Sequence, residues 1–260
     1  MTTSKGKAIA MKKILLMWLL VLSCGAQGAY AAVISPLTMT LSSGGQTIVI
    51  TDQNVVTVGG DMSSAAGSIL FMGTVGTFNI SLAAGVSYPS LGGPTIADLN
   101  LANFNVSSAK GGVLTVTFAD TGYSLAPGTL SASATSAGLI GNAAAGSSVS
   151  VQSWIDPANS GGAAGTQVLA NSSSGPTFGF STPASPFIYG GGPFSIYTQA
   201  VINLTAPVSA SAPASANLAS DVRLAAVAVP EPGSLVFLSA GLFLGAIVVR
   251  GRKRKRDRAT

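Results

Sequence analysis

The sequence predicts an all-β protein: an antiparallel β-sandwich of the jelly-roll type, with an N-terminal signal helix before it and one C-terminal transmembrane helix after it. Three observations favour this fold class. Short runs with an apolar residue at every second position recur between clusters of Gly, Pro, Asn and Ser, which is typical of strands joined by turns. No long helical period occurs between residues 33 and 228. Long apolar runs occur only at the two ends of the 260-residue chain.

The alternation is clearest where Phe78, Ile80 and Leu82 are interleaved with polar side chains. It recurs where Val222 and Leu224 flank Arg223. The remaining predicted strands are 38–41, 46–51, 68–73, 97–107, 113–118, 147–154 and 194–204. Many short strands with turns between them predict an antiparallel sandwich, and about two hundred residues are enough for one two-layer core.

The predicted strand 97–107 changes phase along its length. Its apolar side chains are odd-numbered at Leu99 and Leu101 but even-numbered at Phe104 and Val106. One extra residue near 102–103 would return all four to a single face of the sheet. We therefore expect a β-bulge or a tight bend there.

The residue inventory excludes much enzyme chemistry. The chain has no His, so it offers no Ser-His or Cys-His pair and no His-ligated metal. Its one cysteine, Cys24, lies in the leader, so the exported protein would have no disulfide and no thiol nucleophile. We expect a protein that is not an enzyme and has no cofactor.

The net charge of +5 arises from the termini. Between residues 33 and 229 the only cations are Lys110 and Arg223, against six Asp residues, a net charge of −4. A nucleic-acid interface needs Lys and Arg on the folded domain. The charge pattern therefore predicts no nucleic-acid partner.

Residues 1–31 have the pattern of a secretory signal peptide. Lys12 and Lys13 precede the apolar run 14–22, and Ala29 and Ala31 form an A-x-A site, so we expect signal peptidase to cut before Ala32. The nine apolar residues are too few for a bilayer span of about 20. A lipoprotein modified at Cys24 is a weaker alternative, because Leu22 fits a lipobox poorly.

The C-terminal residues 229–260 form three parts. Val229, Pro230, Glu231 and Pro232 make a short motif whose residues before proline favour extended backbone. Residues 233–249 carry no charge and match the lower length bound, about 17 residues, for a transmembrane helix. A basic tail, 250–260, follows and marks the cytoplasmic side. Its stop-transfer cations are Arg250, Arg252, Lys253, Arg254, Lys255, Arg256 and Arg258. From the residues alone, a plain single-pass anchor remains the alternative.

The order of Pro230-Glu231-Pro232, apolar helix and basic tail closely resembles the PEP-CTERM sorting signal of Gram-negative bacteria that make exopolysaccharide. The resemblance covers about the last thirty residues. It implies that exosortase, a membrane-embedded protease, cuts near the motif and releases or transfers the protein. The chain would then be a substrate of processing.

The exported domain, 32–228, also loosely resembles the central domain of a set of PEP-CTERM proteins of unknown activity. The resembling stretches are 67–78, 98–101 and 111–123. An Ala/Pro/Ser-rich stretch, 205–216, predicts a disordered loop before the last strand.

Six Asp residues are the only acids of this domain. A glycosidase needs two facing carboxyls about 5–10 Å apart, and Asp120 with Asp156 is the candidate pair. The alternative is that both form turns, as Asp120-Thr-Gly and Asp156-Pro suggest. Structural calcium is a further candidate at Asp52-Gln-Asn54 or at 156–159, where we again favour turns.

Aromatic side chains could bind sugars by stacking. The candidates are Tyr88, Tyr123, Trp154, Tyr189 and Tyr197. We expect Trp154 in the core, because it follows the apolar Val151 in a strand pattern. The glycine-rich stretch 187–194 is flanked by aromatics, and we expect a hairpin connection there.

Together these features predict a non-enzymatic exported protein that is sorted to the cell surface or the extracellular polysaccharide matrix after transient anchoring in the inner membrane. Its expected partners are signal peptidase, exosortase, the inner membrane and exopolysaccharide. A carbohydrate-binding surface module is the alternative function. An Asp-dependent secreted hydrolase is a third.

Overall fold

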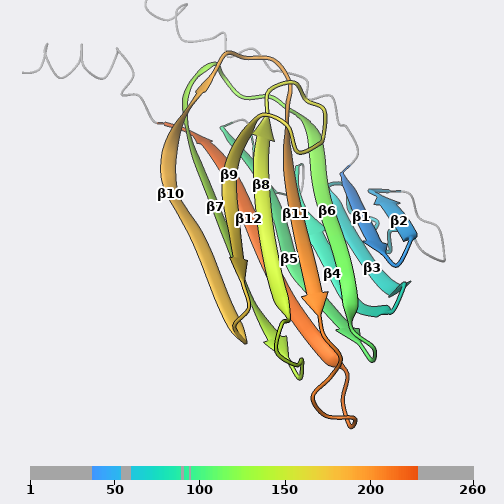
Figure 1. Ribbon diagram of the computed structural model, residues 1–260. Helices are drawn as coiled ribbons and strands as arrows, with labels where there is room; N and C mark the ends of the chain where they lie inside the picture. Colours follow the sequence, from blue (N-terminus) through green and yellow to red (C-terminus); the bar gives the residue numbers. More distant parts are fainter. Residues whose placement is uncertain (1–36, 54–59, 89–90, 94, 228–260) are drawn as a thin grey trace, which may run out of the picture. The chain divides into compact units, whose positions relative to one another are not determined.

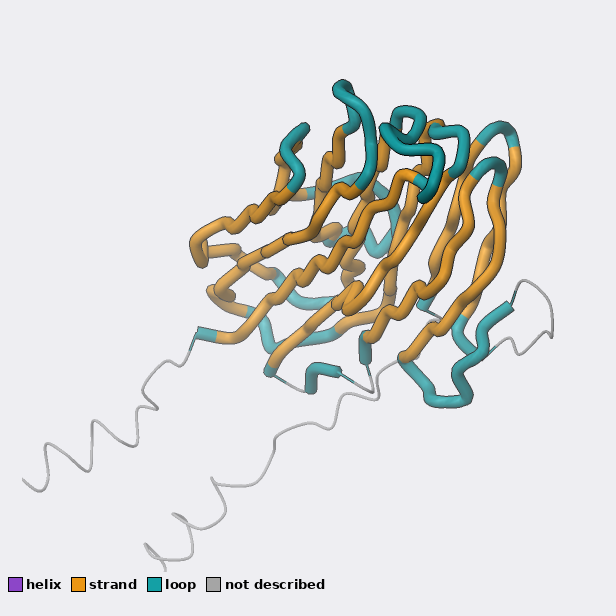
Figure 2. Tube along the Cα trace, turned by 90° about the horizontal axis from the view of Figure 1, so that it is seen from below, coloured by secondary structure: helices purple, strands orange, loops and turns teal. Residues whose placement is uncertain are grey.

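The structure is a computed structural model that describes residues 37–53, 60–88, 91–93 and 95–227. These residues contain twelve antiparallel strands (Figure 1). The strands form two six-stranded sheets, here called sheet A and sheet B. No helix occurs among the described residues, which form strands, turns and loops only (Figure 2). The all-β, antiparallel fold class is thereby confirmed.

Sheet A has the order β2 (Gln46–Thr51), β1 (Thr38–Ser43), β6 (Gly112–Tyr123), β11 (Phe194–Leu204), β8 (Ser148–Asp156) and β9 (Thr166–Ser173). Sheet B has the order β10 (Thr177–Tyr189), β7 (Gly128–Gly141), β12 (Ala214–Ala226), β5 (Ile96–Ser108), β4 (Phe78–Val86) and β3 (Ser68–Val75).

The eight strands from β5 through β12 pair according to one rule. β8 pairs with β9, β7 with β10, β6 with β11 and β5 with β12. These are the pairs of a single long hairpin that turns between β8 and β9. Its strand pairs alternate between the sheets, because β6, β8, β9 and β11 lie in sheet A and the other four in sheet B. The first four strands extend both sheets on one side.

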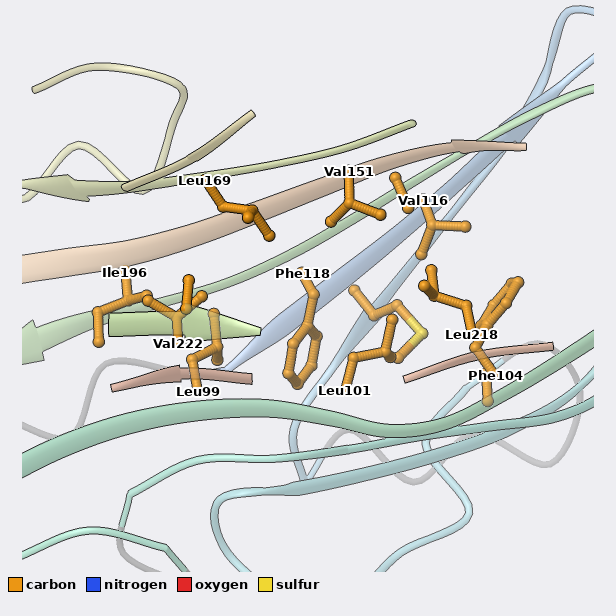
Figure 3. Close-up of a cluster of buried hydrophobic side chains, with 14 of the residues drawn as sticks. Leu99, Leu101, Phe104, Val116, Phe118, Val151, Leu169, Ile196, Leu218 and Val222 are labelled. Carbon is orange, nitrogen blue, oxygen red and sulfur yellow. The ribbon is translucent and has the colours of Figure 1, made fainter. Parts of the chain in front are cut away.

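The core lies between the sheets and is built by the period-two pattern. Val116, Val151 and Leu169 of sheet A point toward Leu99 and Leu101 of sheet B, as Figure 3 shows. The ring of Phe118 also enters this layer and packs on Gly85, where an added Cβ would lie 2.2 Å from the ring. Glycine is therefore required there for the two sheets to approach.

Nine of the twelve strands fall where the alternation predicts them. The bulge in β5 is also confirmed: Phe104 pairs with Leu218 but Leu101 pairs with Ser220, so that Ala102 and Asn103 oppose the single residue Ala219. Leu99, Leu101, Phe104 and Val106 consequently all reach the core. Leu82 does not share the face of Phe78 and Ile80, because the register shifts between Ile80 and Leu82 and leaves Leu82 half-buried.

The expectation for the loop 205–216 was too long. Ala214 already begins β12, so the loop covers residues 205–213. Asn142 holds it, since its side-chain amide donates to the carbonyl of Ala212 at 2.5 Å and accepts from the backbone amide of Ser209 at 3.2 Å. The described loop is thus an ordered, hydrogen-bonded one.

The hairpin expected at 187–194 was wrong. β10 ends at Tyr189 in sheet B and β11 begins at Phe194 in sheet A, so the glycine-rich segment carries the chain from one sheet to the other. The side chains of Tyr189 and Phe194 are both buried, and their ring centroids lie 5.2 Å apart in an edge-to-face arrangement. The glycines let the chain turn sharply between two buried rings, with positive φ at Gly191 and Gly192.

The predicted leader, the motif 229–232, the helix 233–249 and the basic tail lie outside the described residues. Within the described ranges, no helix is long and apolar enough to cross a membrane.

Candidate functional site

The candidate catalytic residues Asp120 and Asp156 lie on β6 and β8, on either side of β11, and each carboxylate has its own hydrogen-bond partners. Asp120 points into the sandwich and is buried, and it accepts a 2.5 Å hydrogen bond from the hydroxyl of Ser87, which follows β4 in the opposite sheet. The Ser87 hydroxyl also contacts the hydroxyl of Tyr123, which donates to the carbonyl of Asp98 at 2.8 Å. These groups form a buried polar link between the two sheets.

Burial raises the pKa of Asp120 to about 6, although hydrogen bonds from Ser87 and Thr121 oppose the shift. The nearby Asp52 raises it further by charge repulsion. Because this buried carboxyl takes up a proton near pH 6, it makes the free energy of unfolding depend on pH.

Asp156 instead closes its own loop. Its carboxylate accepts hydrogen bonds from the amides of Ala158 and Ser160, both at 2.8 Å, and from the Ser160 hydroxyl at 2.5 Å. Burial raises its pKa, but these hydrogen bonds outweigh burial and leave the pKa below its usual value. Asn159 completes the turn by accepting from the Gly122 amide at 2.7 Å. This is the turn that the Asp-Pro sequence predicts, and its amides occupy the oxygens that a calcium ion would need.

The loop after β2 is organised in the same way by the buried Asp61 and the half-buried Asp52. Asp61 accepts from the backbone amides of Ser63 and Leu70 at 2.8 and 2.9 Å, and Asp52 accepts from Gly67 at 2.7 Å. Asn54, the other proposed calcium ligand, lies outside the described residues. Among the described residues, no three acidic, His or Cys side chains are grouped so as to hold a metal ion.

The five candidate aromatics separate into two groups. Tyr123 and Tyr189 are buried in the core, and Tyr88 packs against it. Trp154 and Tyr197 lie together on the outer face of sheet A, with ring centroids 5.4 Å apart. The expectation of Trp154 in the core was wrong, because Val151 and Trp154 are three residues apart in a strand and therefore point to opposite faces.

The outer face of sheet B carries a network of side-chain amides. Asn105 on β5 and Asn217 on β12 are directly paired across the sheet, and their side chains are hydrogen-bonded. Asn103 joins them, accepting from Asn105 at 2.8 Å and from Asn217 at 3.3 Å. Mutual hydrogen bonds fix these amides and leave their remaining donors and acceptors facing outward.

Two acids and an arginine also lie on the outer face of sheet B, to one side of the amide network. Asp221 pairs across the sheet with Asn100, whose amide donates to its carboxylate at 3.0 Å, and Arg223 pairs with Asp98. Burial raises the pKa of Asp98 to about 7. The hydrogen bond that protonated Asp98 donates to Asp221 and charge repulsion by Asp221 also raise this pKa, whereas the attraction of Arg223 lowers it. The Oδ1 atom of Asp98 is buried and has no hydrogen-bond partner in the described part of the chain.

Sequence reasoning missed this polar face. Its Asn and Asp residues belong to two strands that are more than 100 positions apart, so only their pairing brings them together. The available signal was the run of polar residues at alternate positions of 98–107 and 215–223, which predicts one polar face for each strand.

Comparison with known proteins gives no family. No family model matches the chain, and no curated protein matches it. Among solved structures, the adhesin domain of Epf from Streptococcus pyogenes is 10% identical, with a TM-score of 0.29 over 72% of this chain and 57% of that one. The VP2 subviral particle of infectious bursal disease virus is 12% identical, with a TM-score of 0.31 over 78% and 58%. The chain thus covers less than two thirds of either structure, and similarity at these scores assigns neither family nor activity.

Proposed function

We propose that this protein is a non-enzymatic exported protein, delivered to the cell surface or the extracellular polysaccharide matrix by its C-terminal sorting signal. The observation that carries the proposal is the tripartite end of the chain. The motif 229–232, the uncharged segment 233–249 and the basic tail occur in the order and spacing of a PEP-CTERM signal. Signal peptidase would remove residues 1–31, and exosortase would cut near Pro230-Glu231-Pro232.

Physical arguments support each step. A charge at the bilayer centre costs about 2.5–3.5 kcal/mol, so the tail 250–260 resists translocation and holds the motif at the outer boundary of the inner membrane. The prolines keep the motif extended, which suits a protease cleft. The contacts of Asp120 and Asp156 favour a structural role for both over a catalytic one.

The test is replacement of Pro230, Glu231 and Pro232 by alanine in a strain with active exosortase. We expect the variant to accumulate at full length in the inner membrane, whereas the parent yields a shorter form outside it. The control is Pro207→Ala, a proline of the exported domain, which should be processed like the parent. Identical fractionation of the triple variant and the parent would leave a plain membrane anchor.

We also infer that β5 to β12 form a jelly roll. Eight strands paired as one long hairpin, with its strand pairs divided between two sheets, support this finer description. The four preceding strands would then be an extension of a jelly-roll body.

A carbohydrate-binding surface module is the second candidate function. The polar outer face of sheet B favours it, because amide and carboxylate side chains held in fixed positions can each bond two hydroxyl groups. The proposed site needs neither a catalytic pair nor a metal ion.

A further inference from the structure

A groove of about 610 Å³ crosses the outer face of sheet B. Its floor is one cross-strand row of small residues. Gly179 on β10 pairs with Ala137 on β7, Ala137 pairs with Ala219 on β12, and Ala219 lies opposite the β5 bulge at Ala102. Three strand spacings of roughly 4.8 Å make this row about 14 Å long.

The wall of the groove is the neighbouring row on the same face. It consists of Ser181, Thr135, Asp221 and Asn100, which are paired in that order across the four strands and all line the groove. The floor is low because its side chains stop at Cβ or before it, whereas those of the wall are longer. On the other side of the floor, outside the lining, Leu139 pairs with Asn217, which pairs with Asn105.

The floor is held from inside the sandwich. Ser136 and Ser220 point inward and are buried, and their hydroxyls donate to the carbonyls of Ala219 and Thr135 at 3.1 and 3.3 Å. These side-chain bonds add to the regular ladder between β7 and β12. The Asn100–Asp221 hydrogen bond fixes the wall, and the amide network orders the face beside the groove. A site with this much prior order loses little conformational entropy on binding.

We propose that this groove binds an extended, neutral polysaccharide chain. A sugar ring has an apolar face of C–H groups, which suits a floor of Ala and Gly, and hydroxyls at its rim, which suit a wall of Asn, Asp, Ser and Thr. The groove is open and crosses four strands, so a linear polymer fits it better than a compact small molecule. An extended peptide fits less well, because the strands beneath have paired backbone groups and the small floor offers no pocket for an apolar anchor.

The charges near the groove select the ligand class. Asp221 lines the groove, and Asp98 lies beside it. Among the described residues of these two cross-strand rows, Arg223 is the one cation. An acidic polymer would meet the Asp221 carboxylate in the wall, and above about pH 7 that of Asp98 as well, so it is disfavoured against a neutral one.

The inference rests on the proposed function for its choice of a matrix polymer, whereas the groove itself does not depend on sorting. The two fail separately: a chain that is sorted normally but binds no glycan refutes only the groove, and one that binds but is not processed refutes only the sorting.

The test is isothermal titration calorimetry of the full chain in lauryldimethylamine oxide, a detergent whose headgroup is not a sugar. The probes are cellohexaose, laminarihexaose and mannohexaose, with hexagalacturonate as the acidic comparison. We expect at least one neutral hexasaccharide to bind, and hexagalacturonate to bind at least tenfold more weakly. Binding of none of the neutral probes, or tighter binding of hexagalacturonate, overturns the proposal.

Variants locate the binding. Ala219→Leu fills the floor and Asn100→Ala removes a wall amide, and each should weaken the affinity at least tenfold. Ala225→Leu is the matched control, since it adds the same bulk on the same face of β12 but outside the groove, and it should stay within twofold of the parent. Equal affinities of Ala219→Leu and Ala225→Leu overturn the assignment to this groove. Each variant's thermal transition is checked, and Asp221→Asn, which preserves shape, provides a second wall variant that should also weaken binding.

Discussion

Asp120 should make the stability of the domain depend on pH. Its pKa of about 6 in the folded protein lies above the ordinary value of 3.8, so the folded state binds the proton more tightly. The contribution of protonated Asp120 to the free energy of unfolding is therefore fully present below about pH 4. It is lost as the pH rises through about 6 and does not change further above that. The limiting slope for one such group is about 1.4 kcal/mol per pH unit. We expect Asp120→Asn to reduce the pH dependence of urea unfolding between pH 4 and 7 and to leave the part due to Asp98, whose pKa is also raised, to about 7.

Asp156→Asn is the control of opposite sign. Because hydrogen bonds lower the pKa of Asp156, its ionised form stabilises the folded state, and that stabilisation is present above about pH 4. This variant should lose stability at neutral pH. Parallel pH profiles of Asp120→Asn and the parent would contradict the assignment of the buried proton to Asp120.

Gly85 is the residue on which the closest contact between the two sheets depends. In Gly85→Ala the new Cβ would lie 2.2 Å from the Phe118 ring, within a packed core, so we expect a loss of about 1–3 kcal/mol in the free energy of unfolding. Gly179→Ala is the matched strand control, because nothing lies within 4 Å of the Cβ it adds, and it should be neutral or slightly stabilising. Urea midpoints test both, and equal losses would argue against the packing of Phe118 on Gly85.

Among the elements, strands with large alternating apolar residues were predictable from sequence and strands with small ones were not. β11 was found over its full length because Phe194, Ile196 and Ile202 mark its inner face. β7 was missed because its inner face is mostly small, with Ala132, Ala134 and Ser136 buried between Leu130 and Ile140. Small side chains carry too little hydrophobic contrast to reveal a period of two.

β9 and β10 were missed for a different reason. They are the edge strands at one side of the sandwich, so few of their side chains are buried and alternation is weak. β10 also contains Pro183 and Pro186, and proline within a run argues against a central strand. The groove of sheet B could not be predicted from sequence either. Part of its floor comes from β7 and β10, which were missed, and the strand register that aligns the floor residues depends on tertiary pairing.

The two prolines of β10 should protect an exposed sheet edge. Proline lacks the N–H group that an added strand would use, so Pro183→Thr with Pro186→Thr should restore a template for edge pairing. We expect this variant to self-associate more than the parent in analytical ultracentrifugation. Ser185→Thr, which raises strand propensity without removing a proline, is the control. Unchanged sedimentation of the double variant would assign edge protection to the bulge between Thr182 and Ser185 instead.

At the scale of the whole molecule, the described domain and the terminal segments differ in composition. The domain has few charges, of which Asp52, Asp61, Asp120 and Asp156 serve internal contacts, whereas the basic residues are concentrated at the chain ends. The fold class could be predicted from sequence because alternation is a local property. The polar face of sheet B could not, because it depends on which strands become neighbours.

We propose that the chain is processed at both ends and then leaves the membrane. Intact-mass spectrometry of the protein recovered from the matrix of cells with active exosortase tests this most directly. We expect a chain that begins at Ala32 and ends near Pro232, without residues 233–260. A mature chain that begins at Met1 or Met11, or that retains the segment 233–249, would contradict it.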